Sequence, residues 1–339
     1  MPRAIQNENS LIRRIVSGQK LKSRGLSLGI GDDAALFRPT PGYELILTCD
    51  WFLDGTHFLV DRHPPDSIGW KCLARAVSDV AAMGGTPKCF LLSVALPSRR
   101  TGSWLNGFLR GLHRAARSFH CPLAGGDTTE RKEILINVTV IGEVRKDRAL
   151  LRFGAKPGDL IYVSGRLGEA ELGLKRIRQS GKAVAANSSF LRKQLYPEPR
   201  VKLGRWLAEK KLATAMMDLS DSLSSDLPRL CQASGVGAIV NAAQLRMLTR
   251  AKLPKGYIDN TRGSQDLHFA LHGGDDYELL FTVARSKSRQ VPASLDGIPL
   301  TAIGEITREK RVLLRDGQGK VGALRPHGWD PFRQHGRKK

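Results

Sequence analysis

The chain has 339 residues, of which 41% are hydrophobic and 25% charged, so it is long enough for two folded domains and ordinary in composition for a globular protein. No run of about 18 apolar residues occurs, which excludes a membrane-spanning helix. The N-terminal residues lack the apolar core of a signal peptide, and the five cysteines are scattered without a CxxC pair. We therefore expect a cytoplasmic protein with reduced thiols.

The net charge is +22, from 54 Lys and Arg residues against 32 Asp and Glu residues. Such a balance is typical of nucleic-acid-binding proteins, but it also suits a basic surface that attracts small anionic substrates. The basic residues are spread along the chain, and no zinc finger, RNP-type motif or basic zipper accompanies them. We favour the second interpretation and expect no nucleic-acid partner.

Apolar periodicity predicts alternating helices and strands in the first half of the chain. Helices are expected at residues 8–18, from a cap at Asp66 or Ser67 to Met83, and at 104–119. Strands are expected at residues 45–50, 88–97 and 134–144. Asp79 shares a helical row with the buried positions of its helix, so an ionised carboxylate there needs a partner.

The stretch 145–158, which closes in GAKPGD, indicates a domain boundary, and we place the first domain at residues 1–148 and the second at 149–339. The second domain continues the α/β pattern. Strands are expected at residues 159–165, 213–218, 236–242 and 278–284, and helices at 167–179, 199–210 and after a cap at Ser220 or Asp221. We expect loops at 180–198, with one helical turn, and at 251–265.

Acidic clusters recur along the chain: GDD at 31–33, TCD at 48–50, SD at 78–79, GGD at 125–127, DLSD at 218–221 and GGDD at 273–276. Each of them alone is more often a turn or a helix cap. Several directly follow strand-like runs, and the run before Asp50 predicts a carboxylate at a strand end. Mg²⁺ prefers oxygen ligands and shares them with substrate phosphates, and phosphoryl transfer needs positioning and charge neutralisation. We predict that the clusters meet around metal-bound phosphates.

The common nucleotide-binding signatures are absent. The sequence contains no GxxxxGK[ST] loop, no GxGxxG turn between a strand and a helix, and no HRD or DFG motif of protein kinases. His57 has no adjacent nucleophile or acidic partner, so we expect it to position a substrate at most.

Several longer motifs resemble those of thiamine-monophosphate kinases, which belong to the larger family that includes aminoimidazole ribonucleotide synthetase. The resemblance runs from about residue 8 to Trp329. The motifs are GIGDDAAL, TCDWFLDGTHF, GWKCLARAVSDVAAMGGTPKCFLLSVALP, AGGDTTE, FGAKPGDLIYVSG, YPEPRVKLG, MDLSDSLSSDL and HGGDDYELLFTV.

The resemblance implies an α/β fold with mixed sheets and two domains. The N-terminal domain would bind ATP and metal and pair into a homodimer, and the C-terminal domain would be a second α/β unit. The implied reaction converts thiamine monophosphate and ATP to thiamine diphosphate and ADP by direct, in-line phosphoryl transfer with several Mg²⁺ ions.

Carried over position by position, the resemblance implies a set of site residues. The metal ligands would be Asp33, Thr48, Cys49, Asp50, Asp79, Asp127, Asp218 and Asp221. Among them, Asp50, Asp79, Asp127 and Asp221 would be catalytic. ATP would be bound by Gly126, Asp127, Arg152 and Ser220. Thiamine monophosphate would be bound by His57, Asp275 and Trp329.

Four positions depart from the family pattern, one of them Glu130, where the family often has Arg. Cys49 replaces Thr or Ser, and a thiol is a poor Mg²⁺ ligand, so the contact there is either through the backbone carbonyl or lost. Ser222 stands where the family has glycine, and Asp275 is one methylene shorter than the usual Glu. Two other functions stay open: a related ATP-dependent enzyme with another acceptor, and a basic nucleic-acid-binding or regulatory protein without catalysis.

Overall fold

The structure is a computed structural model of the whole chain, and it describes residues 7–17, 21–246 and 262–329. Residues 251–261 of the loop predicted at 251–265 lie outside the described residues, and the prediction is wrong for 262–265, which begin a helix. By backbone packing the chain forms two units. The first unit is Met1–Leu150 with Gly173–Lys211, and the second is Leu151–Leu172 with Leu212–Lys339. The domain boundary after residue 148 stays a prediction.

The first unit contains most of the elements expected from the periodicity. Its helices are α1 (Glu8–Val16), α2 (Pro65–Ala82), α3 (Ser103–Ser118), α5 (Ser189–Leu195) and α6 (Val201–Glu209), with a 3₁₀ turn η1 (Ser98–Arg100). Its strands are β1 (Leu26–Leu28), β2 (Leu36–Phe37), β3 (Tyr43–Leu53), β4 (Thr86–Leu96), β5 (Leu123–Glu130) and β6 (Leu135–Arg145).

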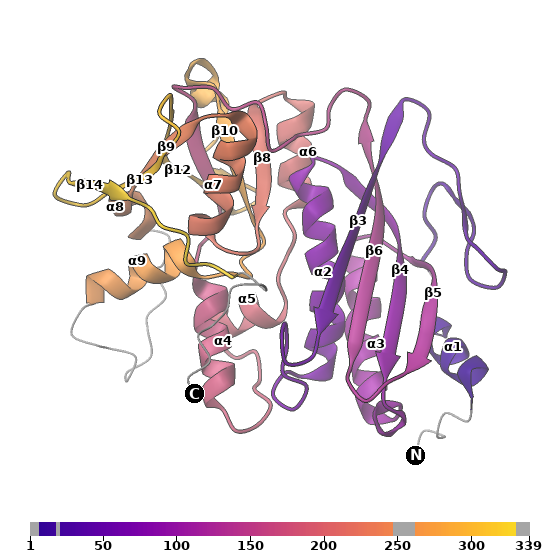
Figure 1. Cartoon of the computed structure of the whole chain (residues 1–339). Coiled ribbons are helices and arrows are strands. Elements are labelled where there is room, and N and C mark those ends of the chain that lie inside the picture. The colour runs from indigo at the N-terminus through magenta and orange to yellow at the C-terminus, as the bar shows by residue number, and fades with distance from the viewer. Residues whose placement is uncertain (1–6, 18–20, 247–261, 330–339) are drawn as a thin grey trace. The chain divides into compact units, whose positions relative to one another are not determined.

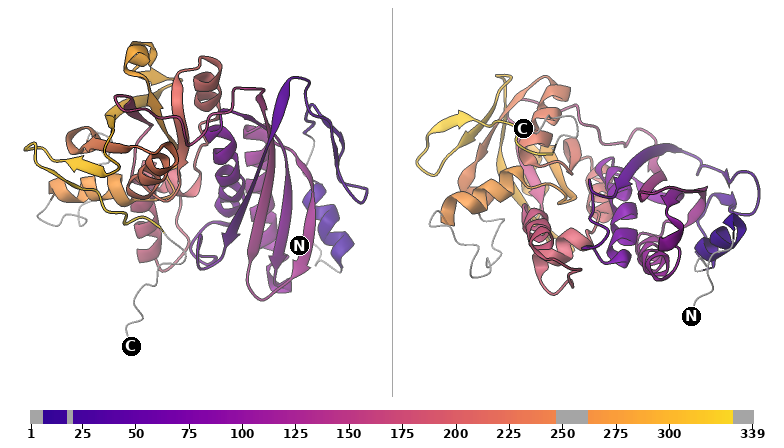
Figure 2. Two further views of the ribbon diagram at one scale, coloured as in Figure 1. Left: turned by 45° about the horizontal axis from the view of Figure 1, so that its top comes forward. Right: turned by 60° about the horizontal axis from the view of Figure 1, so that its bottom comes forward.

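The main sheet of the first unit has the order β3-β6-β4-β5. It is mixed, since β4 and β5 are parallel while β6 is antiparallel to both of its neighbours. Helices α2 and α3 lie on the same face of this sheet, as Figure 1 and Figure 2 show. The core between them contains Phe52, Leu73, Phe90 and Phe108, each at most 1% exposed.

Strand β3 is longer than predicted and has two different faces. The prediction that the strand ends at Asp50 is wrong, because the alternation continues and Phe52, only 1% exposed, fills the core beyond it. The other face carries apolar side chains into solvent, among them Leu47 at 68% and Trp51 at 56% exposure. A row of exposed apolar residues on a sheet is typical of an interaction surface.

Helix α2 begins earlier than expected and crosses α3 closely. Its first residue is Pro65 after Pro64, so the caps predicted at Asp66 or Ser67 are wrong; proline suits the first helical position because its missing N–H has no intrahelical partner there. Where the two helices cross, a Cβ on Gly111 would lie 1.7 Å from the backbone oxygen of Asp66. Only glycine fits at that contact.

The chain returns to the first unit at Gly173, within α4 (Glu169–Gln179), and the helices that follow pack on α2. The indole N–H of Trp70 donates to the carbonyl of Pro197 at 2.7 Å. A Cβ on Gly204 of α6 would lie 2.0 Å from the carbonyl oxygen of Ala81, so α6 and α2 are in backbone contact. Residues 180–198, predicted as a loop with one helical turn, contain the seven-residue helix α5.

The second unit is built on a larger mixed sheet of order β14-β13-β9-β12-β7-β10-β8, with β11 paired to β12. Its strands are β7 (Leu160–Ser164), β8 (Ala213–Leu219), β9 (Gly237–Asn241), β10 (Glu278–Val283), β11 (Ser294–Leu295), β12 (Ile298–Thr307), β13 (Val312–Arg315) and β14 (Val321–Ala323). Its helices are α7 (Leu223–Ser234), α8 (Ala242–Arg246) and α9 (Arg262–His272), with a 3₁₀ segment η3 (Arg285–Gln290). Within the described residues, no helix combines the length and apolarity needed to cross a membrane.

The close α2–α3 crossing gives a test of the first unit's packing. Gly111→Ala should lower the free energy of unfolding by about 1–3 kcal/mol, because the added methyl group overlaps the Asp66 backbone. In an uncrowded helix the same change would raise stability by about 1 kcal/mol. Urea denaturation followed by circular dichroism measures the difference.

Gly181→Ala is the matched control, since no described atom lies within 4 Å of the Cβ position there and φ is not positive. It should leave stability unchanged or slightly higher. A Gly111→Ala variant as stable as Gly181→Ala would contradict the observed crossing.

Candidate active site

In the first unit, β3 and α2 bring Thr48 and Asp79 into contact. The Thr48 hydroxyl donates a short hydrogen bond to the Asp79 carboxylate. This supplies the partner that the half-buried position of Asp79 on its helix requires. Asp50 lies two residues after Thr48 on the same strand, so the two side chains share the inner face of β3. Three oxygen-bearing side chains are therefore grouped where α2 packs against β3.

The side chain of Cys49 lies on the opposite, outer face of β3. Its thiol is exposed and contacts the Asn137 side chain on β6, with Sγ 3.3 Å from Oδ1 and 3.2 Å from Nδ2. Because side chains alternate along a strand, the thiol points away from Asp50 and Thr48. A metal contact at this position would have to use the backbone carbonyl.

Asp127 lies at the other edge of the sheet from Asp50. The register aligns Asp50 with Val138, then Leu92, then Gly126, so Asp127 is one residue beyond the row of Asp50. Three strand spacings of about 4.8 Å place the two aspartate backbones about 14 Å apart. The first unit does not bring Asp127 to Asp50 and Asp79.

Gly126 occupies a position that other residues cannot fill. Its φ is 155°, and a Cβ there would lie 1.9 Å from the carbonyl oxygen of Leu92 on β4. The adjacent Asp127 carboxylate accepts from the backbone N–H of Thr128 at 2.9 Å and is exposed. The GGD sequence therefore gives an exposed carboxylate on a backbone that lies unusually close to its neighbour.

Two further predicted residues of the first unit lie in turns. Asp33 is exposed in the turn between β1 and β2, and its backbone N–H bonds to the Asp32 carboxylate at 2.8 Å. His57 follows β3, and its Nδ1 accepts from the backbone N–H of Leu53 at 3.0 Å. Since Nδ1 is the acceptor, the neutral ring carries its proton on Nε2.

In the second unit, Asp218 is the last residue but one of β8, and Asp221 follows in the turn to α7. Asp218 is 4% exposed and pairs in register with Leu279 on β10. Asp221 forms an ion pair with Arg229 of α7, with Nη1 2.6 Å from Oδ2. Both carboxylates therefore belong to one short segment between strand and helix.

This turn is organised by Asp226, a residue that sequence reasoning did not select. Its buried carboxylate accepts from the backbone N–H groups of Asp221 and Ser222, both at 3.1 Å, and pairs with Arg229 at 2.6 Å. Burial, then the charge of Asp221, raises the pKa of Asp226 to about 6, against the opposing effect of Arg229 and the N–H donors. The only sequence signal for it is an acidic residue in the first turn of a helix.

Ser222 stands where the family has glycine, and it adopts a backbone conformation that favours glycine. Its φ of 135° and ψ of 160° lie in a region populated almost only by glycine. It is also the N-cap residue of α7, so the predicted caps at Ser220 and Asp221 are wrong. The side chain makes no capping bond; its hydroxyl lies 3.1 Å from that of Ser224.

The predicted substrate residues of the second unit converge on the same turn. The backbone N–H of Asp275 donates to the Ser220 carbonyl at 2.8 Å, and that of Trp329 donates to the Asp221 carbonyl at 3.1 Å. The Tyr277 hydroxyl donates to the Asp275 carboxylate at 2.7 Å. Ser220, Asp221, Asp275 and Trp329 are thus neighbours, and the Trp329 ring is 40% exposed.

Arg152 is less closely tied to this group. It is exposed, and its backbone carbonyl accepts from the Ser234 hydroxyl at 3.2 Å, near the end of α7. No contact joins its side chain to Ser220 or Asp221 among the described residues.

The oxygen donors fit Mg²⁺ held together with a phosphate rather than by protein alone. In the part of the chain that the structure describes, no three His, Cys, Asp or Glu side chains are arranged to hold a metal ion. Mg²⁺, however, commonly binds one or two carboxylates and completes its shell with substrate phosphates and water. Thr48, Asp50 and Asp79 suit that mode, whereas the Cys49 thiol does not.

Comparison with known proteins gives the class of the chain. Residues 31–144 match the family described as AIR synthase related protein, N-terminal domain, and residues 156–317 match the corresponding C-terminal domain. The chain belongs to the AIR synthase related proteins, and the predicted two-domain α/β fold with mixed sheets is confirmed.

Individual relatives narrow the class. The thiamine-monophosphate kinase of Bacillus subtilis is 34% identical over 330 residues, which cover 94% of this chain and 97% of the relative. The crystal structure of thiamine-monophosphate kinase from Stenotrophomonas maltophilia is similar with a TM-score of 0.77 and 34% identity, covering 92% of this chain and 96% of that one. A structure of AaThiL complexed with AMPPCP and TMP has a TM-score of 0.72 and 30% identity, with 98% and 99% covered. Within the AIR synthase related proteins, the chain is a member of the thiamine-monophosphate kinase family.

The strained turn at Ser222 gives a stability test. Ser222→Gly should be about 1–2 kcal/mol more stable than Ser222→Ala, because both lose the contact with Ser224 but only glycine relieves the strained φ. Glycine's extra freedom in the unfolded chain offsets part of that gain. Thermal unfolding of the two variants beside the parent protein measures the difference, and equal stabilities would show that the turn is not strained.

Proposed function

We propose that this protein transfers the terminal phosphate of ATP to thiamine monophosphate, giving thiamine diphosphate and ADP. The observation that carries the proposal is the similarity over nearly the whole chain to thiamine-monophosphate kinases, including one described in complex with AMPPCP and TMP. The carboxylates grouped in each unit are the residues that a phosphoryl transfer requires.

Each predicted residue has a role in the proposed reaction. In the first unit, Thr48, Asp50 and Asp79 are assigned as ligands of metal-bound phosphate, and in the second unit Asp218 and Asp221 are assigned the same role. Bound Mg²⁺ would neutralise charge on the transferring phosphoryl group. Gly126 brings backbone close to ATP, and Arg152 and Ser220 contact its phosphates. Asp33 is a further carboxylate ligand and Cys49 contributes only its carbonyl.

The acceptor is proposed to bind at His57, Asp275 and Trp329. The half-exposed Trp329 ring offers an apolar face on which a thiamine ring can stack, and its backbone is fixed to Asp221. Asp275 is one methylene shorter than the usual glutamate, and a hydrogen bond from the Tyr277 hydroxyl holds its carboxylate in a defined position. His57 is assigned to the phosphate of the acceptor.

A homodimer is proposed through the outer face of the β3-β6-β4-β5 sheet. Its exposed apolar side chains are Tyr43, Leu45, Leu47 and Trp51, all on β3. A second copy would remove this row from water, which is the favourable term in most association. A two-fold pairing that also sets the β3 edge of one protomer beside the β5 edge of the other would make neighbours of the strands that carry Asp50 and the partner's Asp127, which lie about 14 Å apart within one chain.

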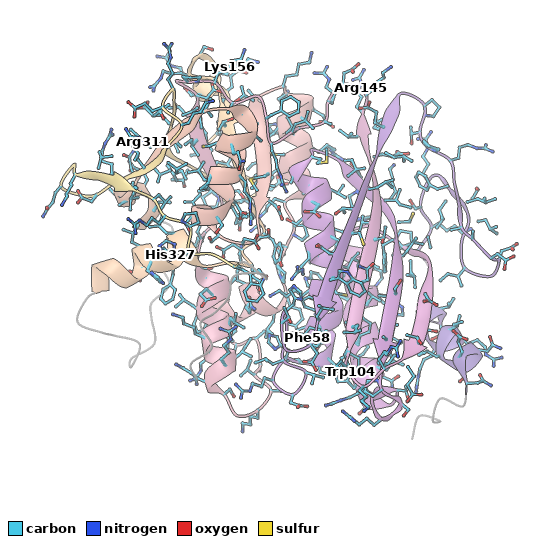
Figure 3. The ribbon with its side chains drawn as sticks, viewed as in Figure 1. Phe58, Trp104, Arg145, Lys156, Arg311 and His327 are labelled. Atoms are coloured by element: carbon cyan, nitrogen blue, oxygen red, sulfur yellow. The ribbon has the colours of Figure 1, made fainter. Side chains whose placement is uncertain are left out.

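The alternatives have less support. A related enzyme of the same fold that uses another acceptor can be distinguished from a thiamine-monophosphate kinase only by assaying activity with each acceptor. Nucleic-acid binding would favour a concentrated basic face, whereas exposed cations are spread over both units, as Arg145, Lys156 and Arg311 illustrate (Figure 3). All five cysteines are free thiols, which suits the proposed location in the cytoplasm.

The proposal is tested by ADP release from ATP and Mg²⁺, with thiamine monophosphate as acceptor and aminoimidazole-pathway substrates for comparison. We expect release only with thiamine monophosphate. Asp50→Asn and Asp79→Asn should each lower kcat by roughly a hundredfold or more, because lost charge neutralisation at phosphate is worth several kcal/mol.

Asp61→Asn is the matched control: Asp61 is an exposed aspartate of the same unit, and among the described residues its ion pair is with Arg100 at the surface. It should retain kcat, and all three variants should unfold near the parent temperature. Acceptor-independent ADP release, or near-normal kcat in Asp50→Asn, would contradict the proposal.

The dimer is tested by mixing inactive chains. A purified heterodimer of Asp50→Asn and Asp127→Asn should recover about half of the parent activity, because one of its two sites then combines an intact Asp50 with an intact Asp127. The two homodimeric variants should be inactive. An inactive heterodimer would show that both aspartates act within one chain.

A further inference from the structure

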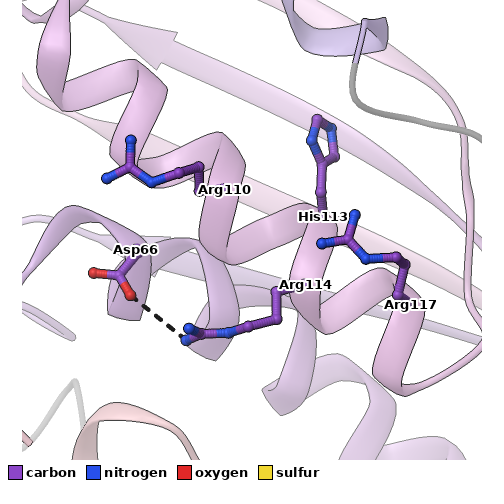
Figure 4. A pocket seen from close by; sticks show the side chains of 5 residues that line it. All are labelled: Asp66, Arg110, His113, Arg114 and Arg117. Atoms are coloured by element: carbon purple, nitrogen blue, oxygen red, sulfur yellow. Dashed lines mark ion pairs between the residues drawn. The ribbon is translucent and has the colours of Figure 1, made fainter.

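Helix α3 places a group of basic side chains on one side of the first unit, away from the predicted active-site residues. Arg110, Arg114 and Arg117 follow the i, i+4, i+7 spacing of one helix face, and His113 lies beside them. Together with Asp66 of α2 they line a hollow of about 380 Å³ (Figure 4). None of the five residues has a role in the proposed reaction.

Arg114 forms a fixed wall of this hollow. Its guanidinium group lies over the rings of Trp70 and Tyr196, at 5.2 and 4.8 Å from their centroids. It also pairs with Asp66 at 3.5 Å, and Asp66 in turn accepts from the Tyr196 hydroxyl at 2.8 Å. Asp66 is therefore already engaged by Arg114 and Tyr196.

The other two arginines contribute uncompensated charge. Among the described residues, no carboxylate forms an ion pair with Arg110 or Arg117. Three guanidinium groups against one carboxylate leave the hollow with two net positive charges when His113 is neutral. A helix C-terminus favours cations, which accounts for Arg117 in the last turn. It does not account for Arg110, which lies in the middle of the helix.

His113 connects the hollow to α1. Its Nε2–H donates to the carbonyl of Ile15 at 3.0 Å, so Nδ1 is the nitrogen without the proton in the neutral ring. Burial, and secondarily the charge of Arg117, lowers the pKa of His113. The Arg117 guanidinium extends back toward the imidazole ring in Figure 4. An anion bound between the Arg117 guanidinium and the His113 ring would offset the charge of Arg117 and so raise the pKa of His113.

We propose that this hollow binds the phosphate group of a small phosphorylated molecule. Two net positive charges match a phosphate monoester, which carries close to two negative charges at neutral pH. Arginine forks bind phosphate oxygens in pairs of hydrogen bonds. The volume falls within the range of small-molecule sites, about 300–1,000 Å³. The proposal does not depend on the proposed kinase reaction, since it involves none of its residues.

A small ligand fits the lining better than a nucleic acid does. Sites for single-stranded nucleic acid combine cations with exposed aromatic faces on which bases stack. Here the neighbouring aromatic rings, Trp70 and Tyr196, are covered by Arg114. A second basic hollow of the first unit differs in its balance of charge. It is lined by Arg99, Arg131 and Lys132 but also by Glu130 and Glu133, beside Pro97 and Ser98.

The test uses inorganic pyrophosphate as the probe and the His113 ring as the reporter. The imidazole signal is assigned by comparing NMR spectra of the full-length protein with those of His113→Gln. Pyrophosphate, added without Mg²⁺, should shift this signal saturably and raise the pKa of His113, because the anion offsets the charge of Arg117. Binding at the active site would not produce that signature.

Two variants decide the origin of the effect. Arg110→Gln with Arg117→Gln should weaken the pyrophosphate affinity reported by His113 at least tenfold. Arg99→Gln with Arg131→Gln removes the same charge from the other hollow and should change that affinity less than threefold. Equal weakening by both pairs, or no shift of His113, would overturn the proposal.

A parallel titration with single-stranded RNA separates the two kinds of ligand. We expect RNA to shift His113 only at higher phosphate concentration than pyrophosphate does. Tighter, strongly salt-dependent binding of RNA at His113 would replace the small-molecule assignment with a nucleic-acid one.

Discussion

Strand β3 must satisfy two opposite environments with one alternating sequence. Its even positions face α2, where Ile46 and Phe52 fill the core and Thr48 and Asp50 stand between them. Its odd positions carry apolar groups outward. Because the side-chain period is two, a slip of one residue would expose the core residues and bury the outward row. The placement of Thr48 and Asp50 beside α2 thus depends on the same register that holds the hydrophobic core together.

Much of this arrangement could be predicted from the sequence because it rests on local periodicity. The helical row through Asp79 indicated a half-buried carboxylate that needs a partner, and the Thr48 hydroxyl is that partner. The glycine at 126 and the serine at 222 were recognised by family motifs, and both have positive φ in the structure. Patterns of this kind describe what each residue requires of its immediate surroundings.

What could not be predicted depends on contacts distant in sequence or on competing local chemistry. The apolar run before Asp50 suggested a strand end, but the core needs Phe52, so the strand continues. Asp127 follows an apolar run in the same way, yet strand order puts it at the opposite edge of the sheet. Asp226 was overlooked because an acid in a first helical turn is common, and its two backbone N–H bonds exist only in the folded turn.

The return of the chain to the first unit at Gly173–Lys211 bears on how the gene can be divided. A fragment that stops near residue 150 would lack α5 and α6, and α2 would lose the helix that contacts it at Ala81 and the carbonyl that pairs with Trp70. Such a fragment would present newly bared apolar surface to other chains and to proteases. The N-terminal and C-terminal halves of the coding sequence therefore cannot be exchanged independently. A chimaera of two relatives is expected to fold only when residues 173–211 come from the same parent as the N-terminal half.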